Sequence, residues 1–200
     1  MSSNIVGILL AAGQSTRFGS NKLLYQLHNG TPMVLASARH LYNVLPQTIA
    51  VVEDANNDVA RLLTQEGIQV IENPLAREGM GTSIACGVAS NADAQGWVIA
   101  LADMPCIPET VIQAVVTGLE QATGIIATVY KKMRGHPVGF SARYAQALMQ
   151  LHTDEGARSV IQANSDSLKL IETTEKGVVV DIDTQESIRL IEQGCGICQV

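Results

Sequence analysis

The stretch that decides the fold is residues 9–24, LLAAGQSTRFGSNKLL, where an apolar run passes into a loop of small residues carrying one Arg and one Lys. Residues 5–11 are apolar and of strand length, which predicts a buried β-strand that ends at this loop. Small residues let backbone N–H groups approach a ligand closely, and Arg17 and Lys22 add positive charge. The stretch predicts an anion-binding loop, although a plain surface turn with two solvated cations fits its spacing about equally well.

The loop matches neither of the two common nucleotide-binding fingerprints. It lacks the G-x-x-x-x-G-K-[ST] spacing of a Walker loop, and it lacks the G-x-G-x-x-G spacing of a dinucleotide-binding turn. A loop of backbone donors with two cations nevertheless suits a polyphosphate.

Outward from the loop, apolar runs of strand length alternate with helical patterns, which is typical of a mostly parallel sheet covered by helices. Strands are expected at residues 5–11, 48–52, 69–71, 97–101, 125–130, 138–140 and 178–182. Helices are expected from Pro32 with Thr31 as its N-cap, across 59–63, from Pro108, from Ser141 to Leu148, across 157–162, and from Asp183, where Glu186 completes a capping box. Because no repeat or linker interrupts the pattern, we expect one α/β domain over residues 1–200, with a core of about 5–192 and a C-terminal tail at 193–200.

Composition narrows the class of protein. Hydrophobic residues make up 46% of the chain and charged residues 16%, which is typical of a globular protein. A formal net charge of -6 and 4% aromatic residues argue against a nucleic-acid or anionic membrane surface. Because no apolar stretch approaches the roughly 20 residues that span a bilayer, and the N-terminus shows no cationic leader, we expect a cytoplasmic protein.

The chain contains four cysteines, which fall into two groups. Cys86 and Cys106 lie in expected core segments and are typical of reduced thiols. Cys195 and Cys198 have the spacing of a redox motif or of half a zinc site. No second Cys or His pair completes a closed zinc site, so a tail that carries two thiols is favoured over a catalytic or metal-binding role.

Two carboxylates follow expected strands. Asp103 lies in LADMP and Asp183 in DIDT, and ligands of open α/β sheets bind beyond the carboxyl ends of the strands. A pair of carboxylates from two strand ends can hold Mg²⁺ against phosphate oxygens. For each residue alone, local structure is the favoured explanation, with Asp103 as a turn or cap residue before Pro105 and Asp183 as a helix N-cap.

Taken together, five motifs resemble one family: L-A-A-G-x-S-x-R-F-G-x-x-K, N-P-x-x-x-x-G-M-G-T-S-I, L-A-D-M-P, R-G-H-P and D-I-D-T. They resemble the molybdenum cofactor nucleotidyltransferases, in particular the cytidylyltransferase (MocA-like) branch of the MobA-like family, which makes molybdopterin cytosine dinucleotide. The similarity runs from about residue 5 to about residue 192. One departure is Gln185, because the family's last motif commonly continues with Pro after D-T.

The resemblance implies a Rossmann-like, GT-A-like nucleotidyltransferase fold with three α/β/α layers, and it assigns roles by position. It places at the nucleotide the residues Leu10, Ala11, Ala12, Gly13, Arg17, Lys22, Asn73, Ser83 and Asp103. It implies catalytic roles for Arg17, Lys22 and Asp103, and Mg²⁺ ligation by Asp103 and Asp183. It places Gly135 and His136 at the pterin-bearing substrate, although Gly135-His136-Pro137 without the resemblance favours a turn with an exposed imidazole.

The implied reaction is in-line attack by the terminal phosphate of molybdopterin on the α-phosphorus of CTP, with release of pyrophosphate. The guanylyltransferase branch usually reads L-A-G-G in the first motif, so L-A-A-G favours CTP, although other sugar and polyol nucleotidyltransferases share that form. CTP, molybdopterin and a molybdenum hydroxylase apoenzyme are the implied partners. Three alternatives stay open: a phosphorylated sugar or polyol as acceptor, a GTP-dependent variant, and a non-catalytic carrier of the cofactor.

Overall fold

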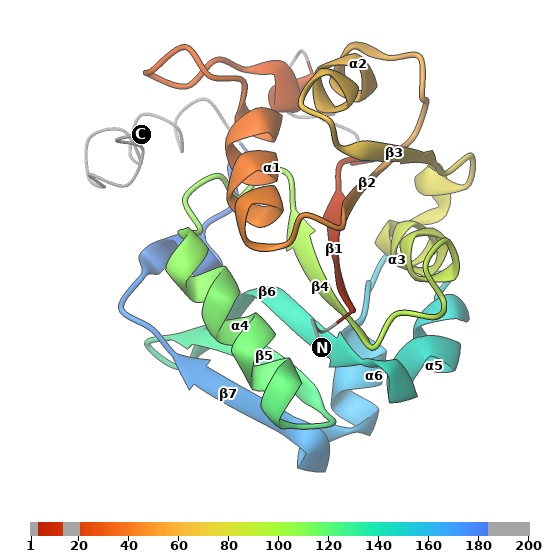
Figure 1. Cartoon of the computed structure of the whole chain (residues 1–200), viewed down its shortest axis with the longest axis vertical. Helices are drawn as coiled ribbons and strands as arrows, with labels where there is room; N and C mark the ends of the chain where they lie inside the picture. The colour runs from red at the N-terminus through yellow and green to blue at the C-terminus, as the bar shows by residue number, and fades with distance from the viewer. Residues whose placement is uncertain (1–3, 14–20, 184–200) are drawn as a thin grey trace.

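A single seven-stranded sheet forms the centre of the computed structural model, which describes residues 4–13 and 21–183 (Figure 1). The strand order is β3-β2-β1-β4-β6-β5-β7, and only β6 runs antiparallel to its neighbours. The strands are β1 Ile5–Leu10, β2 Thr48–Val52, β3 Gln69–Glu72, β4 Gly96–Leu101, β5 Ile125–Tyr130, β6 Met133–Ser141 and β7 Leu168–Glu172. The expected mostly parallel sheet is therefore confirmed, and β2 and β5 have the bounds predicted from sequence.

Helices cover both faces of the sheet and give the three layers expected from sequence (Figure 1). The α-helices are α1 Met33–Val44, α2 Asp58–Gln65, α3 Met80–Ala89, α4 Glu109–Gln121, α5 Ala145–Met149 and α6 Arg158–Ala163. Short 3-10 helices are η1 Lys22–Leu24, η2 Ala76–Glu78, η3 Ala142–Tyr144, η4 Ser165–Ser167 and η5 Lys176–Val179. Helices α1, α2 and α4 pack into the core cluster on one face, and α3, α5 and α6 into the cluster on the other. No helix in the described ranges is both long and apolar enough to cross a membrane.

Strand β1 shows why the central strands read as unbroken apolar runs. All six of its residues are buried, and Leu9 faces one core cluster while Ile8 faces the other. A strand covered on both faces needs apolar side chains at every position, and each fully buried aliphatic side chain stabilises the fold by roughly 1.5–3 kcal/mol. The core is aliphatic, as the composition predicts, with Trp97 and Phe140 as its largest fully buried side chains.

The strand expected at residues 178–182 is wrong. The chain there passes through η5 and continues to Asp183 without regular structure. Its apolar residues are buried all the same, since Val178 and Ile182 are each 0% exposed. The last strand is instead β7, which pairs in parallel with β5 at the edge of the sheet.

Two expected helix caps are also wrong. Helix α1 has Pro32 as its N-cap residue, with no capping side chain, while Thr31 uses its carbonyl to accept the Leu27 N–H at 2.9 Å. Ser141 precedes η3 and caps nothing, and among the described residues its buried hydroxyl has no partner. The helix expected from Asp183 lies outside the described residues.

The thiols differ in burial. Cys106 is buried and Cys86 is partly exposed. Burial raises the pKa of the Cys86 thiol, so it stays protonated at neutral pH and is a poor nucleophile. Cys195 and Cys198 lie outside the described residues.

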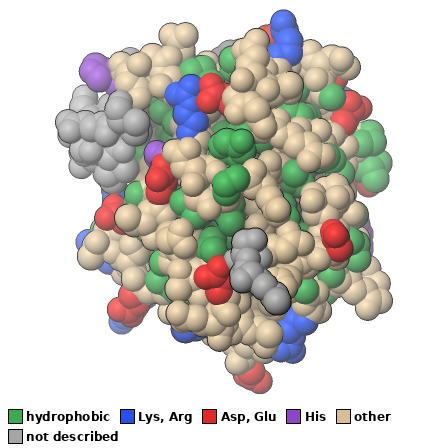
Figure 2. Space-filling view, viewed as in Figure 1, with side chains coloured by type: hydrophobic (Ala, Val, Ile, Leu, Met, Phe, Trp, Pro, Cys, Tyr) green, Lys and Arg blue, Asp and Glu red, His purple; other side chains and the backbone are tan. Residues whose placement is uncertain are grey.

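Charges are dispersed over the described part of the face seen in Figure 2. Lys and Arg side chains alternate there with Asp and Glu and form no continuous basic patch. Any anion bound by this acidic chain therefore depends on a local pocket of donors and cations.

Candidate functional site

Lys22 joins two carboxylates at one end of the sheet. Its Nζ donates to Asp103 Oδ2 at 2.8 Å and to Asp183 Oδ1 at 2.7 Å. The side chains of Lys22, Asp103 and Asp183 are 11%, 21% and 50% exposed, so the cluster lies at the protein surface but is only partly hydrated. Lys22 thus contacts two carboxylates that lie 81 and 161 residues after it in the sequence.

The backbone brings the three residues together. Asp103 follows β4, the parallel neighbour of β1, and the Ala102 N–H donates to the Leu10 carbonyl at 3.1 Å. Lys22 opens η1, whose start is capped by the Asn21 side chain accepting from the Leu23 N–H at 3.1 Å. The C-terminal segment is tied to the same place, because the Ile182 N–H donates to the Asp103 carbonyl at 3.0 Å.

The electrostatics of the cluster favour cations. Burial is the largest single influence on the pKa of Lys22 and lowers it, but the hydrogen bonds and charges of Asp103 and Asp183 together raise it above its usual value. Burial, and then the charge of Asp183, raise the pKa of the nearby Asp181. Three neighbouring carboxyl groups therefore create a negative potential at this end of the sheet, and Lys22 offsets part of it.

A cavity of about 260 Å³ opens beside Asp103. Its walls come from the end of β1, from the region around η2 and α3, and from the end of β4. The lining residues are Leu10, Ala12, Gly13, Ala76, Arg77, Gly79, Met80, Ser83, Leu101, Asp103 and Asp154. Small residues at the end of β1 leave room for a ligand there.

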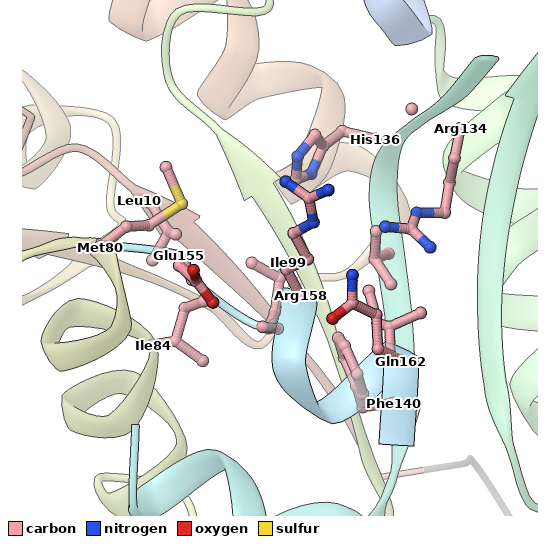
Figure 3. A pocket seen from close by; sticks show the side chains of 15 residues that line it. Leu10, Met80, Ile84, Ile99, Arg134, His136, Phe140, Glu155, Arg158 and Gln162 are labelled. Atoms are coloured by element: carbon pink, nitrogen blue, oxygen red, sulfur yellow. The ribbon is translucent and has the colours of Figure 1, made fainter. Parts of the chain in front are cut away.

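A second cavity, of about 490 Å³, adjoins the first and shares Leu10 and Met80 with it (Figure 3). Apolar side chains form much of its wall, including Ile84, Ile99, Phe140 and Ile161. Figure 3 shows that the side chains of His136, Arg134 and Arg158 converge on this cavity from β6 and α6. Within the described ranges neither arginine forms an ion pair, so both guanidinium groups are available to an anion.

His136 lies inside β6, so its interpretation as part of an exposed turn is wrong. The turn falls instead at Lys131 and Lys132, which have positive φ values of 46° and 70° between β5 and β6. Burial lowers the pKa of His136, which makes its imidazole neutral at pH 7. Its Nδ1 is buried and has no hydrogen-bond partner among the described residues.

Comparison with known proteins identifies the fold and the family. Residues 7–168, most of the chain, match the MobA-like NTP transferase domain. The chain belongs to this family.

Relatives of this MobA-like NTP transferase differ in what they are named for. The chain is 25% identical to the purine catabolism protein PucB of Bacillus subtilis, over 94% of the chain and 96% of PucB. It is 26% identical to a probable molybdenum cofactor guanylyltransferase of Thermococcus sibiricus, over 74% of the chain and 72% of the relative. The crystal structure of Rv0371c from Mycobacterium tuberculosis superposes with a TM-score of 0.80 at 24% identity, covering 96% of the chain and 100% of that structure. The expected α/β nucleotidyltransferase fold is therefore confirmed.

Most of the residues predicted for the site of this NTP transferase line one of the two cavities or lie beside them. Leu10, Ala12, Gly13, Ser83 and Asp103 line the smaller cavity, and Gly135 and His136 line the larger one. Lys22 and Asp183 contact the cluster around Asp103. Arg17 lies outside the described residues.

Ala11 and Asn73 line neither cavity. The Ala11 N–H donates to the Val51 carbonyl at 2.8 Å and so extends the pairing of β1 with β2. Asn73 is 3% exposed, and its amide contacts the wall of the smaller cavity from behind. Direct contact of either residue with a nucleotide stays a prediction.

Sequence reasoning missed several lining residues. Arg158 lines the larger cavity, and Arg77, Met80 and Asp154 line the smaller one. Arg77 and Met80 lie within the N-P-x-x-x-x-G-M-G-T-S-I stretch, although no role was assigned to them there. The sequence gives no signal for Asp154 and Arg158, because α6 and the loop before it reach the cavities only through the tertiary fold.

Asp103 and Asp183 could hold a divalent cation. Both carboxylates already approach one cationic atom, Lys22 Nζ, and carboxylate oxygens are the ligands that Mg²⁺ prefers. In the described ranges no group of three or more His, Cys, Asp or Glu residues is arranged to enclose a metal ion. The pair therefore fits an ion that completes its coordination with water and phosphate oxygens, as Mg²⁺ does at nucleotides.

Gly135 has a structural role whether or not it contacts substrate. A Cβ added there would lie 2.0 Å from the Val178 carbonyl oxygen, which is a backbone atom. We expect Gly135→Ala to lower the free energy of unfolding by about 1–3 kcal/mol, because β6 and η5 would have to separate. Urea unfolding measures this, with Gly13→Ala as the control, since a Cβ at Gly13 would meet no atom of the described residues within 4 Å. Equal unfolding midpoints for the Gly135 variant and the wild type would contradict this packing role.

Proposed function

We propose that the protein transfers CMP from CTP to the terminal phosphate of molybdopterin, which yields molybdopterin cytosine dinucleotide and pyrophosphate. The observation that carries the proposal is the contact of Lys22 with both Asp103 and Asp183 beside two adjoining cavities. The smaller cavity takes the nucleotide and the larger one takes the acceptor. A molybdenum hydroxylase apoenzyme is the expected recipient of the product.

The reaction needs no general base, because a phosphate nucleophile is already an anion at neutral pH. Catalysis then consists of aligning the phosphate with the α-phosphorus and neutralising the charge on the phosphoryl oxygens. Lys22 supplies a partly buried cation for this purpose, and Arg17 is expected to supply another. Mg²⁺ held by Asp103 and Asp183 would neutralise further charge on the triphosphate.

The larger cavity supports an acceptor with a flat, partly apolar ring system and an anionic group. Its apolar wall suits the ring system, while Arg134 and Arg158 suit a phosphate. One relative is named for molybdenum cofactor guanylyl transfer, which supports molybdopterin as the acceptor.

CTP is favoured by the wall of the smaller cavity. Ala12 lines this cavity, where the guanylyltransferase branch usually has Gly. The methyl group of Ala12 takes up space beside the ligand and so favours a pyrimidine over a larger purine. GTP is the second candidate, because the named relative is a guanylyltransferase.

A panel of nucleoside triphosphates tests the proposed function. With Mg²⁺ and molybdopterin present, we expect pyrophosphate release with a kcat/KM for CTP at least about tenfold above that for GTP, the scale of a small steric difference in a pocket. Ala12→Gly serves as a matched variant, and we expect it to lower the ratio of kcat/KM for CTP to kcat/KM for GTP. A preference for GTP would contradict cytidylyl transfer, and no release with any nucleotide would contradict nucleotidyl transfer altogether.

A further inference from the structure

The ammonium group of Lys22 lies between the two carboxylates that suit a divalent cation. Its Nζ is 2.8 Å from Asp103 Oδ2 and 2.7 Å from Asp183 Oδ1, so one cationic atom contacts both side chains. A divalent cation on the same pair of carboxylates would lie close to this ammonium group, and like charges repel strongly in a partly buried site. Lys22 and a divalent cation therefore compete for Asp103 and Asp183.

The ammonium group points to the carboxylates and not into a cavity. Asp103 lines the smaller cavity, whereas Lys22 lines neither of the two cavities. The Lys22 side chain is 11% exposed, and that of Asp183 is 50% exposed. To neutralise a triphosphate in the smaller cavity, the Lys22 ammonium group therefore has to turn away from the carboxylates and toward the cavity.

The backbone of Lys22 is held in place, while its side chain can make this turn. Lys22 begins η1, where the Leu23 N–H donates to Asn21 Oδ1 and the Tyr25 N–H donates to the Lys22 carbonyl, each at 3.1 Å. The buried side chain of Leu23 anchors the same turn. A lysine carries its charge on a flexible four-carbon stem, so Nζ can change partners without a change in the backbone.

We propose that Lys22 is an exchangeable internal cation, which keeps divalent cations off Asp103 and Asp183 until a nucleotide binds. The inference rests on the proposed function, because it takes a triphosphate in the smaller cavity as the group that draws the ammonium group away. Lys22 then contacts the phosphates, and the two carboxylates become available to the cation that accompanies the nucleotide. The protein is therefore expected to bind a metal–nucleotide complex in preference to the metal alone.

Binding of Mn²⁺ to the full-length protein without nucleotide tests the exchange. The electron paramagnetic resonance signal of free Mn²⁺ falls when the ion binds, so the measurement needs no enzymatic activity. Lys22→Met is expected to lower the Kd for Mn²⁺ at least about tenfold relative to the wild type, the scale of one charge-assisted hydrogen bond. Adding Asp183→Asn to Lys22→Met is expected to abolish this gain, because it removes one of the two carboxylates.

Arg77→Met is the matched control. It also removes a positive charge from beside the smaller cavity, but Arg77 forms its ion pair with Glu53 and not with the two carboxylates. The Arg77 side chain is 75% exposed, so solvent screens its charge, and we expect a Kd for Mn²⁺ within about twofold of the wild type. Should Lys22→Met not fold, as thermal unfolding would reveal, the neutral variant Lys22→Gln takes its place.

The outcomes separate the inference from the proposed function. Equal Mn²⁺ binding by the wild type and Lys22→Met, including no binding by either, overturns the inference and leaves the proposed function in place. An equal gain in Arg77→Met also overturns it, because the effect would then be one of general charge. Isothermal titration calorimetry with Mg²⁺ and a CTP analogue that has a methylene bridge between the α- and β-phosphorus atoms tests the nucleotide site separately. A wild type that does not bind this analogue overturns the proposed function, and the inference falls with it.

Discussion

Asp103→Asn lowers kcat/KM for CTP about a thousandfold in the expected result, the scale of losing a metal ligand and a charged contact at a phosphoryl-transfer site. The substitution keeps the size and shape of the side chain but removes the negative charge. Asp103 Oδ2 is the atom that lies 2.8 Å from Lys22 Nζ, so the variant also loses one of the two carboxylates that hold this ammonium group. Pyrophosphate release from CTP in the presence of molybdopterin and Mg²⁺ measures the loss.

The matched control for this variant is Asp166→Asn, at an exposed carboxylate in η4 outside both cavities. It is expected to keep wild-type activity. Thermal unfolding of both variants shows whether the fold survives. Turnover of Asp103→Asn within a few-fold of the wild type would exclude Asp103 from the transfer step.

Removing the Lys22 charge is expected to cut kcat/KM by roughly a hundredfold or more, because a preorganised buried cation contributes on this scale. Lys22→Met is the variant of choice, since it keeps most of the apolar stem while losing the ammonium group. Because Asp103 and Asp183 hold the pKa of Lys22 above its usual value of 10.5, the group stays charged throughout the neutral range. The loss is therefore expected to be equal at pH 6 and at pH 9.

Two further variants sharpen the Lys22 experiment. Lys169→Met removes an exposed charge from the edge strand β7 and is expected to have no effect on kcat/KM. Lys22→Arg keeps the charge, but a planar guanidinium group does not occupy the position of a compact ammonium group, so only partial activity is expected. Near wild-type turnover by Lys22→Met would remove Lys22 from the mechanism.

The buried parts of the fold were the most predictable from sequence. Strands covered on both faces read as continuous apolar runs, and β2 and β5 follow from that pattern alone. The pattern of apolar runs gives a wrong prediction at residues 178–182. Val178 and Ile182 are buried there, but the backbone forms no strand. Edge strand β7 escaped prediction for the opposite reason, since its side chains are half-buried or exposed and carry no apolar run.

Small residues also made one helix difficult to predict from sequence. Helix α3 begins in the G-M-G-T-S-I stretch, where no helix was expected. Gly81 is there because a Cβ would lie 2.6 Å from the Thr153 carbonyl oxygen, so the helix start packs directly on another backbone segment. A contact between residues this far apart in sequence leaves no local signal.

The candidate site likewise contains some residues that the sequence predicts and others that it does not. Lys22, Asp103 and Asp183 lie in short motifs at the ends of predicted elements, and the structure brings them to one point. Arg158 and the Asn73–Ser83 hydrogen bond depend on how α6 and α3 pack against the sheet, which no spacing in the sequence encodes.

The most direct test of the account follows the phosphate itself. CTP labelled with radioactive phosphorus at the α-position is incubated with Mg²⁺, molybdopterin and either the wild type or Asp103→Asn, and the products are separated. We expect label to pass into a molybdopterin dinucleotide with the wild type and to stay in CTP with the variant. Label that stays in CTP with the wild type, or that moves equally well with Asp103→Asn, would contradict it.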